Sequence, residues 1–254
     1  MTREQPKQAP PPVQRLRVRY AKRGRLRFTS HRDFSRAFER AVFRARLPMA
    51  YSSGFNPHPR ISYANASPTG AASEAEYLEI GLAERRDPEQ VRLALDASLP
   101  PGIDVLECAE AGEGTGALAD RLDATRWRID LPGIEPAELS AAVERLLAAD
   151  QVLVTKRTKN GTRDVDARAA VVSATVSGET GCAILGIVVR QLTPTVRPDD
   201  VVAALAAVAD LRPPSPPRAV REAQGRLDDS GHVADPLGPD RVMRSCCQEE
   251  SAPV

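Results

Sequence analysis

The apolar residues between Arg15 and Cys108 change their period several times, and the order of these changes restricts the possible folds more than any other property of the chain. Residues 15–20 alternate strictly between apolar side chains and arginines, which is typical of a strand with one buried and one basic face. In chain order the sequence predicts a strand at 15–20, a helix from Ser30 to near Leu47, strands at 61–64 and 76–82, a helix from Asp87 to the prolines at 100–101, and a strand at 103–108. This β-α-β-β-α-β order is that of a ferredoxin-like domain.

A second set of alternating periods follows Ala124. There we expect strands at 127–131, 151–157, 165–175 and 182–190, and helices at 135–149 and 201–209. We therefore predict an α+β fold of two tandem ferredoxin-like (βαββαβ) domains. The expected organisation is a disordered N-terminus at 1–12, a first domain at 13–110, a glycine-rich linker at 111–124, a second domain at 125–212 and a disordered C-terminal tail at 213–254.

The composition limits the core and the cellular setting. Hydrophobic residues make up 42% of the 254 residues but aromatic residues only 4%, so the cores must consist mainly of alanine, leucine and valine. No run of eighteen apolar residues occurs, and the N-terminus is polar and proline-rich, so we expect a cytoplasmic protein without a membrane span or secretory signal. The cysteines lack metal-site spacing, and we expect neither a metal nor a cofactor; they are Cys108, Cys182, Cys246 and Cys247.

The net charge of +1 conceals two segments of opposite charge. Residues 15–46 contain twelve lysines and arginines against only Asp33 and Glu39. In residues 71–124 the acidic residues outnumber the basic ones. Such segregation is typical of a protein that binds a polyanion, but the two segments can also neutralise each other.

The first predicted helix concentrates the positive charge. Arg32, Arg36, Arg40 and Arg44 recur every four residues and form a ridge beside the apolar stripe. Because like charges at this spacing repel each other, the ridge is either an ordinary solvated face or a site that binds an anion. Ser30 precedes the helix, and Asp33 stands where a capping box places an acid.

Two histidines are candidates for acid–base chemistry. His31 falls in the first helical turn, where free backbone N–H groups favour an anion, and His58 lies in a stiff loop between two prolines. Together they could cut RNA as an acid and a base. The alternative, which we favour, is that Asn56 and His58 only shape the loop through local hydrogen bonds, and that Asp33 caps the helix.

Two further groups of charged residues are candidate binding sites. Glu74 and Glu76 share one strand face and could bind a metal, although pairing with the arginine ridge is the better explanation. In the second half, a hairpin turn at 159–162 carries a basic group that could contact RNA phosphates or simply aid solubility. Its members are Lys156, Arg157, Lys159, Arg163 and Arg168.

Three blocks of residues resemble the signature of the radical SAM-linked protein family. They are Ser30-His31-Arg32-Asp33, Gly54-Phe55-Asn56-Pro57-His58-Pro59-Arg60-Ile61-Ser62 and Ser73-Glu74-Ala75-Glu76-Tyr77. A weaker block lies at 158–168, so the similar segments span about Leu16 to Ala209. The chain departs from the family pattern at Arg32 and Phe34, where leucine is common.

The resemblance implies a partner rather than a reaction. The family's domain occurs alone or joined behind a radical SAM enzyme, and its activity is not settled. The resemblance also adds Gly54, Phe55, Asn56 and Arg60 to the candidate binding residues. This chain has no Cys-x-x-x-Cys-x-x-Cys motif, so it would work with a separately encoded radical SAM enzyme.

Three functions are compatible with these observations. We expect an RNA-binding accessory protein that presents a structured RNA to a radical SAM enzyme for modification or processing. One alternative is an enzyme that cleaves or modifies RNA with His31 and His58. The other alternative is a protein-interaction module that docks the radical SAM partner without RNA.

Overall fold

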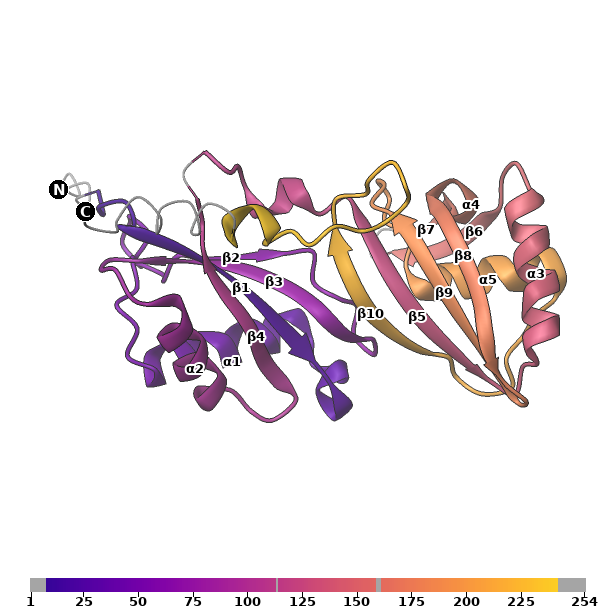
Figure 1. The fold of residues 1–254 in the computed structure, drawn as a ribbon, viewed down its shortest axis with the longest axis horizontal. Coiled ribbons are helices and arrows are strands. Elements are labelled where there is room, and N and C mark those ends of the chain that lie inside the picture. Colours follow the sequence, from indigo (N-terminus) through magenta and orange to yellow (C-terminus); the bar gives the residue numbers. More distant parts are fainter. Residues whose placement is uncertain (1–7, 113, 159–160, 242–254) are drawn as a thin grey trace, which may run out of the picture. The chain divides into compact units, whose positions relative to one another are not determined.

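The computed structural model describes residues 8–112, 114–158 and 161–241. The chain forms two compact units (Figure 1). Unit 1 comprises Met1–Thr69, Ser73–Asp120 and Pro236–Val254, and unit 2 comprises Gly70–Ala72 and Arg121–Asp235. Both units combine helices with an antiparallel sheet, which confirms the α+β class. No helix of the described ranges is long and apolar enough to cross a membrane.

The described residues of unit 1 form four strands and two long helices. Its elements are β1 (Gln14–Lys22), α1 (His31–Arg44), β2 (Ile61–Ala64), β3 (Ala72–Leu82), α2 (Pro88–Ser98) and β4 (Ile103–Glu110). The strands lie in the order β4-β1-β3-β2, and each pair is antiparallel. The element order is therefore the one that the sequence predicts, with strands that extend a few residues further.

The core of unit 1 lies between one sheet face and the two helices. Leu16 and Val18 of β1 point toward the helices, where Phe34 and Phe38 of α1 meet them. Tyr20 stacks on Phe34 with ring centroids 4.5 Å apart. Because side chains alternate along a strand, Arg15, Arg17 and Arg19 lie on the opposite sheet face.

Unit 2 repeats the arrangement with an inserted hairpin. Its elements are β5 (Ala124–Pro132), α3 (Pro136–Ala148), β6 (Leu153–Thr158), β7 (Gly161–Asp166), α4 (Ala167–Ala170), β8 (Val171–Glu179), β9 (Cys182–Arg190), α5 (Pro198–Ala209) and β10 (Arg218–Gly225). The main sheet has the order β10-β5-β9-β8, and β6 and β7 form a separate hairpin. Helices α3 and α5 pack on one face of this sheet around Leu139, Leu146 and Leu205 (Figure 1).

The structure differs from the expectation in two segments. The single strand expected at 165–175 is interrupted, because Asp166 accepts a hydrogen bond from the backbone N–H of Ala169 and caps the short α4 between β7 and β8. The segment expected to be a linker contains a 3-10 turn at Leu118–Arg121 with Leu118 and Leu122 buried. Both segments are therefore part of the packed structure.

The C-terminal segment is ordered as far as Arg241, which corrects the expectation of a disordered tail from residue 213. β10 pairs with β5 from Arg218 opposite Asp130 to Gly225 opposite Ala124. Its order comes from backbone pairing in the sheet, which a local hydrophobic pattern does not record. Residues 242–254 lie outside the described residues, as do Cys246 and Cys247.

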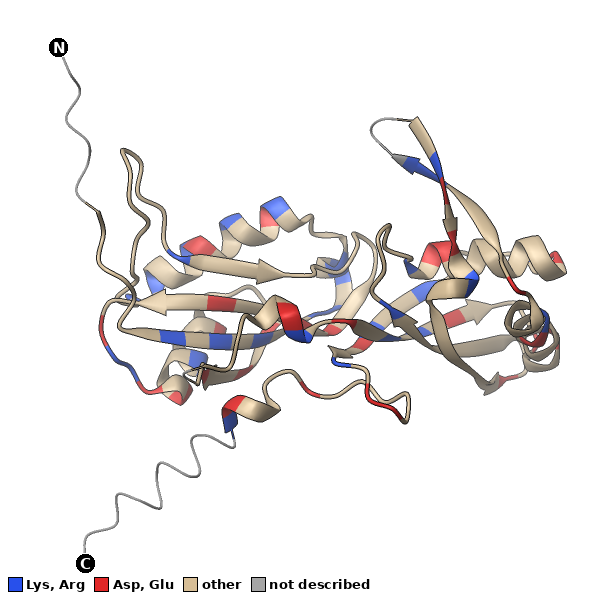
Figure 2. Cartoon of the chain, turned by 90° about the horizontal axis from the view of Figure 1, so that it is seen from above, with Lys and Arg blue, Asp and Glu red and all other residues tan. Residues whose placement is uncertain are grey.

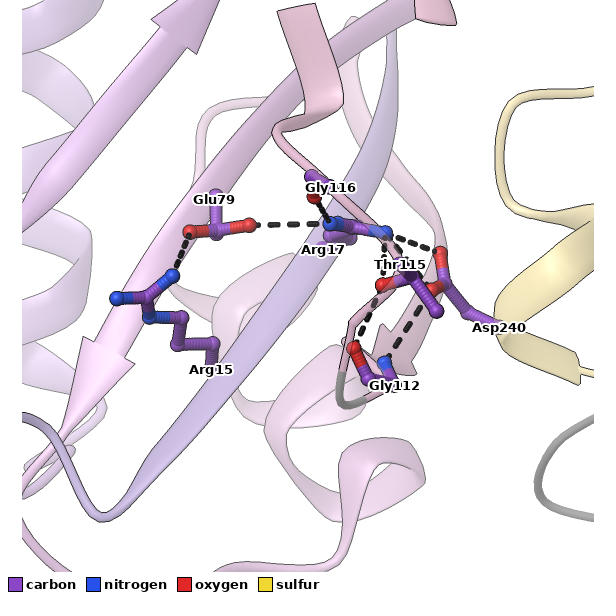
Figure 3. A network of polar contacts seen from close by, with 7 residues as sticks. All are labelled: Arg15, Arg17, Glu79, Gly112, Thr115, Gly116 and Asp240. Atoms are coloured by element: carbon purple, nitrogen blue, oxygen red, sulfur yellow. Dashed lines mark hydrogen bonds and ion pairs between the residues drawn. The ribbon is translucent and has the colours of Figure 1, made fainter. Parts of the chain in front are cut away.

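The same segment buries part of the face of β1 that we expected to be basic. The side chain of Arg17 is only 2% exposed, and its terminal nitrogen donates to both carboxylate oxygens of Asp240 at 2.7 and 2.9 Å (Figure 3). Arg17 also donates to Glu79 at 3.3 Å, to the hydroxyl of Thr115 at 3.2 Å and to the carbonyl of Gly116. A buried cation of β1 thus holds the C-terminal segment on the sheet.

Candidate nucleic-acid interface

The start of α1 shows what Ser30 and Asp33 do. The hydroxyl of Ser30 accepts a hydrogen bond from the backbone N–H of Asp33 at 3.2 Å and donates to the carboxylate of Asp33 at 2.7 Å. These contacts satisfy one of the free N–H groups of the first turn. Ser30 and Asp33 therefore have the capping role that we favoured.

The arginine ridge is exposed. We call Arg32, Arg36, Arg40 and Arg44 the basic face of α1; all four are exposed, and the residues on the opposite side of the helix are buried. Figure 2 shows both basic and acidic positions along this helix. Among the described residues, none of the four has an acidic partner within ion-pair distance. Arg44 makes one polar contact, a 3.4 Å hydrogen bond to the carbonyl of Ser98. The guanidinium groups of this face therefore form no ion pair within the described part of the chain, although the carboxylate of Glu39 lies among them.

The acidic residues that we expected to neutralise the ridge have other partners. Glu74 binds Arg23, whose Nε donates to Oε1 at 2.8 Å, and Arg23 also binds Asp104 at 2.7 Å. Glu76 is buried and accepts a hydrogen bond from the backbone N–H of Ser67 at 2.9 Å. The expected pairing of Glu74 and Glu76 with the ridge is wrong, because Glu74 is paired with Arg23 and Glu76 is buried at the backbone of Ser67.

An aromatic residue that the sequence analysis missed lies on the basic face. Phe43 is 83% exposed, and with Arg36, Glu39, Arg40 and Arg44 it lines a shallow depression of about 410 Å³. At 100° per residue, Phe43 stands opposite the buried Phe34 on the helix. That position on the helical wheel is the signal that could have identified it.

The two candidate catalytic histidines are not brought together. The ring of His31 packs edge-on against Tyr63, with centroids 5.1 Å apart, on the side of the sheet that the helices cover. Burial raises the pKa of Tyr63 to about 12, so this neighbour stays protonated at neutral pH. His58 lines a groove with Ser62 and Glu79, which alternate with Tyr63 and Leu78 and so face the opposite side.

The loop around His58 is a narrow, hydrogen-bonded hairpin. The backbone N–H of His58 donates to the hydroxyl of Ser52 at 3.0 Å, and the N–H of Ser52 donates to the carbonyl of His58 at 2.9 Å. Nε of Arg60 donates to the carbonyl of Tyr51 at 3.1 Å. The tip of the loop carries Gly54 at φ +124°, a conformation that favours glycine, followed by the exposed Phe55 and Asn56.

A second hollow of about 410 Å³ lies beside this loop, on the sheet face that the helices leave uncovered. We call it the sheet groove, and its polar lining is Arg15, Ser52, His58, Arg60, Ser62 and Glu79. A terminal nitrogen of Arg15 lies 4.0 Å from one carboxylate oxygen of Glu79, and Nε of Arg17 donates a hydrogen bond to the other oxygen (Figure 3). Half of the polar lining comes from the loop and half from three strands.

Only some of the basic side chains of the unit 2 hairpin are available to a ligand. Nζ of Lys156 binds the carboxylate of Asp200 at 2.6 Å, and Arg168 donates to the carbonyls of Leu147 and Val171. Arg157 and Arg163 are exposed, whereas Lys159 lies outside the described residues. Lys156 and Arg168 therefore have structural contacts, and the described hairpin offers two free arginines.

The described residues contain no group of three or more histidine, cysteine or acidic side chains arranged to hold a metal ion. Cys108 is buried, and burial raises the pKa of its thiol to about 12, with smaller contributions from nearby carboxylates. Cys182 is half-buried.

Comparison with known proteins gives a family. Residues 15–198 match the family described as an uncharacterized protein conserved in bacteria, DUF2344. The chain belongs to this family. The DUF2344 match includes the basic face, the loop at 51–60, the sheet groove and the hairpin of unit 2, whereas β10 and Asp240 lie outside it.

The other comparisons add little for this DUF2344 protein. No curated protein matches it. Similar solved structures include an encapsulated DyP-type peroxidase from Mycobacterium smegmatis, at 11% identity over 87% of this chain and 94% of that chain, with a TM-score of 0.21. DyPB from Rhodococcus jostii RHA1 matches at 11% identity over 78% of this chain and 85% of that chain, with a TM-score of 0.18. Likeness at this level carries no argument about fold or activity.

Proposed function

We propose that this chain is an RNA-binding accessory protein that contacts RNA phosphates through the basic face of α1. The observation that carries the proposal is that Arg32, Arg36, Arg40 and Arg44 are exposed without an acidic partner among the described residues. Arginines four residues apart repel each other in the free protein. A polyanion relieves that repulsion and releases its own counterions, which favours association.

Phe43 favours RNA over other polyanions. Its exposed ring stands among three arginines that line the same depression. An exposed aromatic ring stacks on an unpaired base while neighbouring arginines bind the phosphates on either side. The depression is shallow and has one carboxylate, Glu39, so it fits a flexible backbone better than a base-specific pocket.

The proposed partner is a separately encoded radical SAM enzyme to which the protein presents a structured RNA for modification or processing. This part rests on the resemblance of the blocks at 30–33, 54–62 and 73–77. We further propose that each unit is a ferredoxin-like domain. The βαββαβ order of β1 to β4 with α1 and α2 supports this, as does the same order in unit 2 once the β6–β7 insertion is set aside.

Fluorescence anisotropy with a labelled structured RNA across a salt series tests the binding proposal. The variant Arg36→Glu/Arg40→Glu should raise Kd at least about tenfold and flatten the dependence of log Kd on log salt by about 1.5 units, because two phosphate contacts are lost. The matched control is Arg145→Glu/Arg190→Glu, which makes the same charge change at exposed positions of unit 2. Equal weakening by both variants would show that only net charge matters.

Absence of binding by the wild-type protein at low salt would remove the RNA proposal. The favoured function would then be the protein-interaction module that docks the radical SAM partner without RNA. Retention of the radical SAM partner after nuclease treatment is the result expected of that alternative.

A further inference from the structure

We propose that the sheet groove binds a phosphate monoester that carries a neighbouring hydroxyl group. The groove lies on the sheet face away from α1, so this inference is independent of RNA binding by the basic face. Its volume of about 410 Å³ falls in the range of small-ligand sites.

Two guanidinium groups supply the positive charge of the groove. The side chain of Arg15 is 62% exposed, and its ion pair with Glu79 is long at 4.0 Å. Arg60 uses Nε to bind the carbonyl of Tyr51, while its two terminal nitrogens have no partner in the described part of the chain. Paired guanidinium groups with free N–H donors are suited to the several oxygens of a phosphate.

Further hydrogen-bond donors complete the phosphate-binding side of the groove. The hydroxyl of Ser52 accepts the hydrogen bond from the backbone N–H of His58, so its own proton remains free to donate. Ser62 and the ring of His58 are exposed at the same groove. No side-chain partner holds either of them among the described residues.

Glu79 is the reason why the groove should prefer a phosphate ligand that also carries a hydroxyl group. Arg17 holds one of its carboxylate oxygens at 3.3 Å, and the other faces Arg15 (Figure 3). A carboxylate in this position repels a bare anion but accepts a hydrogen bond from a hydroxyl group. The three guanidinium groups of Arg15, Arg17 and Arg60 outnumber the two carboxylates of Glu79 and Asp240, which leaves the positive charge that a phosphate needs.

The wall of the groove also depends on a glycine. A Cβ atom at Gly81 would lie 3.0 Å from Cβ of Pro12 and 3.4 Å from Cβ of Arg60. A side chain there would press on Pro12 and would reach the stem of Arg60. Gly81 therefore keeps the space open beside the guanidinium groups.

Isothermal titration calorimetry of the full-length protein in chloride buffer tests the proposal with ribose 5-phosphate, methyl phosphate and ribose. Ribose 5-phosphate should bind more tightly than methyl phosphate, and ribose alone should give no signal. Arg15→Gln should weaken binding of ribose 5-phosphate at least about tenfold, the loss expected for one charge-assisted contact. Arg36→Gln on the basic face is the matched control and should leave this binding unchanged.

Arg60 also supports the loop, so it is tested as Arg60→Gln and as Arg60→Lys, which keeps the charge. Weaker binding by Arg60→Gln than by Arg60→Lys supports a phosphate contact. The proposal fails if methyl phosphate and ribose 5-phosphate both give no signal at millimolar concentration, or if Arg15→Gln binds as the wild type does. It also fails if Arg36→Gln loses as much affinity as Arg15→Gln.

A free sugar phosphate and the phosphorylated end of an RNA present the same chemistry. A trinucleotide with a 5′-phosphate, compared with the same trinucleotide bearing a 5′-hydroxyl, distinguishes them. Tighter binding of the phosphorylated trinucleotide than of ribose 5-phosphate identifies an RNA end, and the reverse order identifies a small metabolite. Variants of the basic face that lose RNA binding should still bind ribose 5-phosphate in the sheet groove. The RNA proposal and the groove proposal can therefore be disproved independently.

Discussion

At the scale of single residues, the contact between Arg17 and Asp240 is the most consequential in unit 1. Both side chains are buried, at 2% and 0% exposure, and their contacts join four separated parts of the chain, including the two that carry Arg17 and Asp240. An arginine buried this deeply must have its charge compensated, because desolvation costs several kcal/mol per ion. Its guanidinium group therefore orders both Glu79 and the C-terminal segment.

We expect Asp240→Asn to lower the stability of unit 1 by about 3–5 kcal/mol, because it leaves a buried guanidinium group without its main counter-charge. The double variant Arg17→Met/Asp240→Leu should be less destabilised than Asp240→Asn, since neither charge remains. Hydrogen exchange of the β1 amides during urea unfolding measures both effects. Glu89→Gln, which breaks an exposed pair with Arg92, is the control and should leave the exchange unchanged.

At the scale of elements, α1 presents two different surfaces. Phe34, Phe38, Ala41 and Val42 fix the helix on the sheet, while the opposite side carries Phe43 among arginines. A ring that is 83% exposed contributes little to folding, so its removal should report on binding alone.

We expect Phe43→Ala to weaken binding of single-stranded RNA about tenfold, because stacking of one base is lost, and to leave binding of a fully paired duplex unchanged. The melting temperature should stay the same or rise slightly, since alanine is the better helix former. The matched control is Phe28→Ala, which removes another exposed ring outside α1. Equal losses for single-stranded and duplex RNA would mean that Phe43 does not stack on bases.

The elements of unit 1 could be predicted because each carries a local signal. Ser30 and Asp33 cap α1, Asp87 caps α2 through the N–H of Gln90, and β1 alternates strictly. β10 could not be predicted, because its sequence Arg-Ala-Val-Arg-Glu-Ala-Gln-Gly has one β-branched residue and no regular alternation. Its strand conformation comes from pairing with β5, which lies far away in the sequence.

The candidate site residues also divide into those that a local sequence pattern predicts and those that depend on strand pairing. Helical periodicity predicts that Arg32 to Arg44 form one face, which depends only on the helix itself. The sheet groove depends on the pairing of Ser62 with Glu79 and of Arg15 with Gly81, and no local pattern contains this register. For the same reason, sequence spacing could not show that His31 and His58 lie on opposite sides of the sheet.

At the scale of the whole molecule, the segment from Arg218 to Arg241 contributes to both units. β10 adds a strand to the sheet of unit 2, and Asp240 and Arg241 bind Arg17 and Glu107 in unit 1. The family match ends at residue 198, before both contributions begin. A chain limited to the matched range should therefore be less stable than the longer chain.

Three truncations separate the two contributions, with hydrogen exchange of β1 and β5 amides as separate measurements for the two units. A chain that ends at Arg241 should exchange as the full chain does. A chain that ends at Asp235 should exchange faster in β1 but not in β5, because the contacts that it loses, Asp240 with Arg17 and Arg241 with Glu107, both belong to unit 1. A chain that ends at Arg212 should exchange faster in both, since β5 also becomes an edge strand without β10. Unchanged β1 exchange in the chain ending at Asp235 would show that Arg17 does not depend on Asp240 for its place in the fold.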